Sequence, residues 1–85
     1  MTREEIFKTL RDTMSNSTEE DIDWASVTEQ SEIASLGFDS LAVLDLIYDV
    51  QQAFDLDFEA EQLTNVKTVG DLVSFLEQQL AKANS

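Results

Sequence analysis

The sequence has no cysteine, histidine or proline, and it has only two glycines among its 85 residues. The lack of cysteine and histidine excludes disulfides, thiolate nucleophiles, imidazole bases and zinc sites built from these residues. Two glycines are too few for the many turns of an all-β fold. A chain of this length fits one domain with a thin core, so we treat residues 1–85 as a single domain.

Basic residues are also scarce, and their distribution is uneven. The net charge is −13, and every charged side chain between Asp12 and Val66 is negative. Such a surface repels phosphate backbones and anionic lipids, so we expect no nucleic-acid or membrane partner. It favours encounter with proteins that carry basic patches, although acidity can also serve solubility alone. No apolar run approaches the ~20 residues of a membrane span, and the first residues do not resemble a signal peptide, so we expect a cytoplasmic protein. We also expect it to be a monomer.

Apolar residues recur at helical spacing along most of the chain. Thr2 with Glu5, and Thr68 with Asp71, have the spacing of a capping box at the start of a helix. The predicted helices span about Thr2–Met14, Ser40–Phe54, Glu59–Asn65 and the residues after Thr68. The predicted fold is therefore all-α: a small four-helix bundle with a long first loop, Ser15–Asp39, and a short third helix.

The segment Leu36-Gly37-Phe38-Asp39-Ser40-Leu41 is the most informative part of the sequence. Gly37 permits a backbone turn that a side chain would resist, and Asp39 is a good N-cap. Ser40 then falls in the first turn of the second predicted helix, beside its unpaired N–H groups and positive dipole end. A phosphate ester on this hydroxyl would meet a favourable environment, although most serines at such positions are ordinary caps.

These residues resemble the attachment motif of the acyl carrier protein family. Asp39-Ser40-Leu41 matches its core, Leu36-Gly37 precedes it as in the family, and Asp45 supplies an acidic residue five positions after the serine. The resemblance implies that a phosphopantetheinyl transferase moves 4′-phosphopantetheine from coenzyme A onto Ser40, and that acyl groups are carried as thioesters on this arm. The reactive chemistry then belongs to the cofactor. We therefore predict a carrier with no catalytic residues rather than an enzyme.

The second predicted helix has two different faces. One face is a core stripe formed by Val43, Leu46, Ile47, Val50 and Phe54. By position in the family pattern, Leu41, Leu44, Asp45 and Tyr48 lie on a partner-contacting face, and Asp39 adjoins them. The alternative is that the helix is buried on both faces and that its second set of apolar residues is further core. We predict a docking face for acyl-transferring, condensing or ligase-type enzymes with basic patches.

The biosynthetic pathway is less well defined by the sequence than the carrier function. Ala42, Gln51 and Gln52 stand where carriers of fatty acid synthesis frequently have acidic residues, and Leu-Gly-Phe-Asp-Ser-Leu resembles the form common in polyketide synthase carriers. Both features favour a polyketide or other specialised acyl pathway over fatty acid synthesis. One alternative is a peptidyl carrier protein, in which a second glycine tends to replace Phe38. Another is an acidic helical interaction module without a prosthetic group.

Three further features have alternative interpretations. Asp21, Asp23 and Glu32 fit three positions of a calcium-binding loop, but Ala25 and Ser26 stand where a ligand and a glycine are needed, so we predict no metal site. Trp24 is expected to anchor the long loop to the core. Phe38 can pack under the loop or contact a partner, and the sequence leaves both open.

Overall fold

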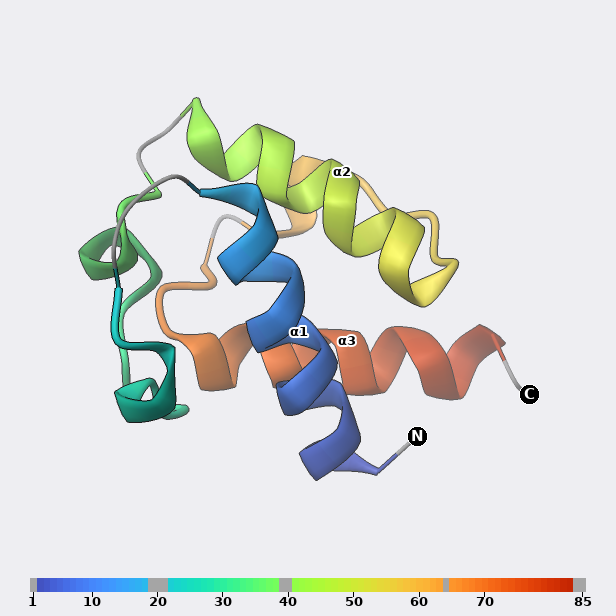
Figure 1. The fold of residues 1–85 in the computed structure, drawn as a ribbon. Coiled ribbons are helices and arrows are strands. Elements are labelled where there is room, and N and C mark those ends of the chain that lie inside the picture. The colour runs from blue at the N-terminus through green and yellow to red at the C-terminus, as the bar shows by residue number, and fades with distance from the viewer. Residues whose placement is uncertain (1, 19–21, 39–40, 64, 84–85) are drawn as a thin grey trace.

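The structure is a computed structural model that describes residues 2–18, 22–38, 41–63 and 65–83. It contains three α-helices and three short 3₁₀ turns, which are α1 Arg3–Ser17, η1 Trp24–Ser26, η2 Ile33–Leu36, α2 Ala42–Phe54, η3 Ala60–Leu63 and α3 Val69–Ala83. Helix α1 packs against both α2 and α3, and the long first loop wraps one end of the three helices (Figure 1). The expected all-α class is confirmed, since the described residues include no β-strand and only an isolated bridge between Glu32 and Thr68.

The predicted count of four helices is not confirmed, because one of the four is not an α-helix. The segment Glu59–Asn65, predicted as the short third helix, contains the four-residue 3₁₀ turn η3 instead. Four residues cannot offset the cost of nucleating an α-helix, whereas a 3₁₀ turn closes with shorter hydrogen-bonded rings. Helix α1 also runs to Ser17 rather than Met14. The Ser17 hydroxyl donates to the Thr13 carbonyl and to the Asp49 carboxylate on α2, which ties the last turn of α1 to its neighbour.

Both predicted capping boxes are present. The Thr2 N–H donates to Glu5 Oε1 at 2.8 Å and the Glu5 N–H donates back to Thr2 Oγ1 at 3.2 Å. At α3 the Asp71 N–H donates to Thr68 Oγ1 at 3.1 Å, and the Thr68 N–H donates to Asp71 Oδ2 at 3.3 Å. Backbone N–H groups hydrogen-bonded to these carboxylates hold the pKa of Glu5 and of Asp71 below their usual values.

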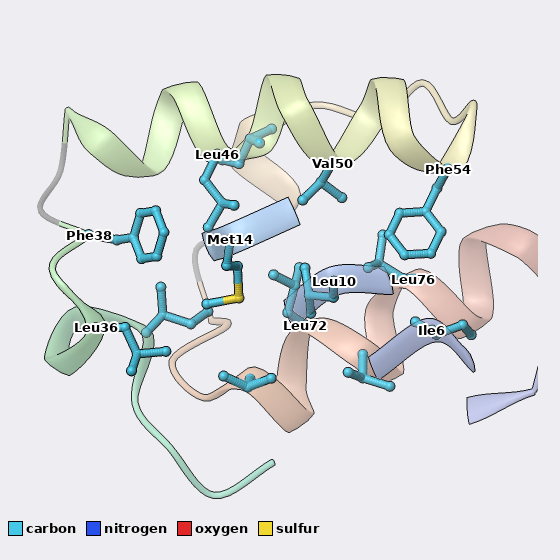
Figure 2. Close-up of a cluster of buried hydrophobic side chains, with 14 of the residues drawn as sticks. Ile6, Leu10, Met14, Leu36, Phe38, Leu46, Val50, Phe54, Leu72 and Leu76 are labelled. Atoms are coloured by element: carbon cyan, nitrogen blue, oxygen red, sulfur yellow. The ribbon is translucent and has the colours of Figure 1, made fainter. Parts of the chain in front are cut away.

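The core lies between the three α-helices and the loop segment around η2 (Figure 2). It includes four of the five residues of the predicted α2 stripe, while the fifth, Val43, is half-buried at its edge. Phe38 is only 2% exposed, so the ambiguity over this residue is settled in favour of packing under the loop. Trp24 is half-buried against the core, as the anchoring role requires. The buried residues are Ile6, Leu10, Met14, Val27, Ile33, Leu36, Phe38, Leu46, Ile47, Val50, Phe54, Phe58, Val69, Leu72, Val73 and Leu76.

A short backbone ladder fixes the long loop to the start of α3. The Ile33 N–H donates to the Lys67 carbonyl at 2.9 Å, and the Gly70 N–H donates to the Glu29 carbonyl at 2.8 Å. Arg3 adds side-chain bonds from α1, because its guanidinium pairs with Glu29 on the loop and with a carboxylate on α3. These contacts position η2, and hence the segment that leads into α2, relative to the other helices.

Candidate attachment site

The described residues on either side of the attachment serine differ sharply in exposure. Gly37 ends η2 in the left-handed conformation, with φ 88°, which a glycine adopts without strain. Phe38 is buried immediately after it, whereas Leu41, the N-cap of α2, is 76% exposed. The predicted N-cap Asp39 and the predicted attachment residue Ser40 lie between these two and outside the described residues. Helix α2 itself begins at Ala42, two residues later than predicted.

Helix α2 separates its two predicted faces clearly. Leu46, Ile47, Val50 and Phe54 are at most 9% exposed, whereas Leu41, Leu44 and Tyr48 are 76%, 54% and 62% exposed. Asp45 lies among these three residues in sequence and is exposed as well. The alternative of a helix buried on both faces is therefore wrong. Large apolar side chains with this much exposure on one face are typical of a surface that another protein covers.

A cavity of about 300 Å³ is lined by residues on both sides of the attachment serine, among them Phe38 and Val43, and sequence reasoning missed it. Its wall is mostly apolar, and its exposed lining residues are Glu32, Ala34 and Lys67. We call the part of the lining formed by these three exposed residues the mouth of the cavity. The remaining lining residues, buried or half-buried, are Ile33, Phe38, Val43, Leu46, Ile47, Leu63, Val66 and Leu72.

The described part of the acidic loop shows no cluster of carboxylates that would hold calcium. Asp21 lies outside the described residues, Asp23 accepts a hydrogen bond from the Ser26 hydroxyl at 2.7 Å, and Glu32 lies in the bridge to Thr68. Within the described ranges, no three acidic side chains come close enough together to hold a metal ion. In the same ranges, no helix is long and apolar enough to cross a bilayer.

The fold and the segment before α2 define a phosphopantetheine carrier. The family described as "Phosphopantetheine attachment site" matches residues 8–76. An acyl carrier protein from Exiguobacterium sibiricum is 44% identical over 59 residues, covering 61% of this chain and 75% of the relative. Another, from Coprothermobacter proteolyticus, is 35% identical over 81 residues, covering 94% and 96% of the two chains. A crystal structure of an acyl carrier protein from Thermotoga maritima superposes with a TM-score of 0.80 at 26% identity, covering 95% of this chain and 93% of that one.

The chain therefore belongs to the acyl carrier protein family. It is a carrier rather than an enzyme, and its cofactor is a covalently attached 4′-phosphopantetheine. Family membership also implies that it works with a phosphopantetheinyl transferase and with acyl-processing enzymes. The described residues fit this cofactor, because the attachment motif runs directly into the exposed Leu41 and then into the N-terminal turn of a helix.

Proposed function

We propose that Ser40 carries the phosphopantetheine arm and that residues 1–85 act as one acyl carrier domain, as a monomer in the cytoplasm. The main support is the family match, which spans Asp39-Ser40-Leu41 at a point where the chain emerges from a buried Phe38 to an exposed Leu41. An arm attached here starts at the surface and can reach other proteins. When bound, the arm supplies a thiol that holds acyl groups as thioesters.

The residues around Ser40 would hold the phosphate end of the arm. The N-terminus of α2 presents its positive dipole end there, which stabilises a phosphodiester charge. Asp45 is the acidic residue of the first turn of α2, and its exposure to solvent screens its repulsion of that charge. The rest of α2 is held against the core by its buried face.

The docking face is the second part of the proposal. Leu41, Leu44 and Tyr48 would enter an apolar groove on a partner enzyme, with Asp39 and Asp45 contacting basic residues at its rim. Aromatic and large aliphatic side chains exposed together are typical hot spots, while charges at the rim set orientation and association rate. Partners of this kind are the transferase and acyl-transferring, condensing or ligase-type enzymes. We also propose that this acidic surface binds neither nucleic acid nor anionic membranes.

The 300 Å³ cavity would shelter the first part of the acyl chain. An engineered apolar cavity of about 150 Å³ holds one benzene ring, so this volume takes roughly a dozen carbon-sized atoms. Val43, three residues after Ser40, lines it, and so the cavity lies within reach of a flexible arm. An acyl chain inside removes apolar surface from water, which stabilises the loaded carrier.

A polyketide or other specialised acyl pathway remains our preferred assignment over fatty acid synthesis. Ala42 and Gln52 leave the docking helix with few carboxylates. Gln51, by contrast, has an internal role that explains its lack of charge, since its side-chain amide donates to the Phe58 carbonyl and closes the loop after α2. The apolar character of the docking face supports partners that bind more by burial than by charge pairing.

Thiol titration tests the carrier function directly, because the chain contains no cysteine and has no background reaction. The protein is incubated with a phosphopantetheinyl transferase, coenzyme A and magnesium, freed of coenzyme A, and treated with a thiol reagent. We expect one thiol per chain, against none before the reaction. An acidic interaction module without a prosthetic group shows no thiol before or after the reaction. A peptidyl carrier also gains one thiol. It is distinguished from an acyl carrier in a second step, by whether partner enzymes load the thiol with aminoacyl or with acyl groups.

A further inference from the structure

The mouth of the cavity carries two opposite charges in an otherwise apolar lining. Lys67 and Glu32 both line the cavity and are both exposed, and they come from the two segments joined by the Glu32–Thr68 bridge. The deeper wall is formed by aliphatic and aromatic side chains such as Phe38, Leu46 and Leu72. The cavity therefore has an apolar interior and a polar rim.

Lys67 is unusual in this chain because it is the only basic residue between Arg11 and Lys82. A basic residue at the mouth is therefore not explained by a generally basic surface. Its charge also acts on Asp71, but in the described part of the chain its ammonium group lies in no salt bridge. A lysine stem can lie along an apolar rim while its ammonium group stays in water above the opening.

The direction in which cargo enters decides which of its atoms meet this rim. An acyl chain tethered through its thioester enters tail first, so its last carbons lie deepest and the carbons nearest the thioester stay at the mouth. An oxygen on carbon 3 would then lie at the part of the lining that includes Lys67 and Glu32. A hydroxyl there would accept a hydrogen bond from the ammonium group or donate one to the carboxylate, which replaces water that the charged group loses.

We propose that the cavity selects acyl chains with an oxygen on carbon 3 over fully saturated chains of the same length, and that Lys67 is the residue that determines this choice. The inference rests on the proposed function, because it requires an arm on Ser40. A saturated chain fills the same interior but partly desolvates the two rim charges without offering them a partner. A hydroxyl or keto group provides that partner, whereas an added carboxylate would face Glu32 as well as Lys67.

The test compares two cargoes of equal length on the intact protein. The transferase loads octanoyl and 3-hydroxyoctanoyl groups from their coenzyme A thioesters, and thermal unfolding of each loaded form is compared with that of the unloaded carrier. We expect the 3-hydroxyoctanoyl form to melt about 6 °C or more above the octanoyl form, which is the lower end of the shift expected for one hydrogen bond to a charged group in a domain of this size. The proposal is overturned if the two loaded forms melt at the same temperature, or if neither melts at a temperature different from that of the unloaded carrier.

Variants assign the effect to one side chain. Lys67→Met keeps the apolar stem and removes the charge, so the difference between the two cargoes should disappear. Lys67→Arg should retain it, and Lys8→Met, which makes the same change in net charge at an exposed position of α1, should leave it intact. A difference that persists in Lys67→Met shows that another group selects the cargo. Failure of the transferase to add any thiol to the wild type instead contradicts the proposed function, so the two failures are distinguishable.

Discussion

Ile47 and Tyr48 are consecutive residues of α2 in opposite environments, since the first is 9% exposed and the second 62%. Successive helical residues point about 100° apart, which allows one to join the core while its neighbour faces solvent. This pair therefore separates stability from partner binding at the scale of single residues.

Replacing these two residues should have different consequences. Ile47→Asp loses roughly 1.5–3 kcal/mol of burial and adds the desolvation of a carboxylate, which should unfold or nearly unfold a domain whose total stability is roughly 4–13 kcal/mol. Tyr48→Ala should stay within about 1 kcal/mol of the wild type but slow acyl transfer to a partner enzyme. Thermal unfolding and transfer kinetics measure the two effects. If Tyr48→Ala melts as low as Ile47→Asp, the docking face is misassigned.

Gly70 is a residue whose lack of a side chain is required by packing. A Cβ added there would lie 2.9 Å from the Glu29 carbonyl oxygen, and its backbone N–H already donates to that same atom. Gly70→Ala should therefore cost about 1–3 kcal/mol through overpacking, despite the better helix propensity of alanine. Urea unfolding checks this value. A variant as stable as the wild type would mean that the loop–α3 ladder is easily displaced.

The helices and their ends are the level at which the sequence was most informative. The capping residues Thr2 and Thr68 could be recognised because a cap depends on residues three positions apart. The 3₁₀ turn η3 could not be distinguished from a short α-helix, because the choice depends on marginal nucleation and on contacts made after folding. The cavity and its Lys67 could not be predicted either, since the lining joins η2, α2, η3 and the start of α3, which no local pattern brings together.

The cap of α3 predicts a specific dependence of stability on pH. The pKa of Asp71 is lowered in the folded state, first by the Lys67 N–H and then by the Thr68 N–H. Its contribution is therefore complete above the unfolded pKa near 3.9 and is lost as pH falls through the lower folded value. Asp71→Asn should be less stable than the wild type at pH 7, with the difference shrinking from roughly pH 5 to pH 3. Protonation of the other carboxylates at low pH relieves their mutual repulsion in the wild type and in Asp71→Asn alike, so this effect cancels when the two proteins are compared. A difference independent of pH, measured by urea unfolding, would contradict this role.

At the scale of the whole molecule, the dominant property is the net charge of −13 with few compensating cations. This field should steer the carrier toward basic docking patches, and salt should weaken it because the screening length falls from about 10 Å at 0.1 M to about 3 Å at 1 M. We expect the association rate with a cognate enzyme to fall roughly tenfold or more over that range. The dissociation rate should change less, since Leu44 and Tyr48 bind by burial. Stopped-flow kinetics at several salt concentrations test this, and an association rate indifferent to salt would mean that the acidity serves solubility alone.

The central claim is that one serine of this acidic helical domain carries the arm on which its whole function depends. The most direct measurement is the intact mass of three proteins after incubation with the transferase, coenzyme A and magnesium. We predict that the wild type and Ser35→Ala, a control at an exposed serine of η2, each gain the mass of one phosphopantetheine. Ser40→Ala should gain nothing. Modification of Ser40→Ala at any other residue, or no modification of the wild type, would contradict the account.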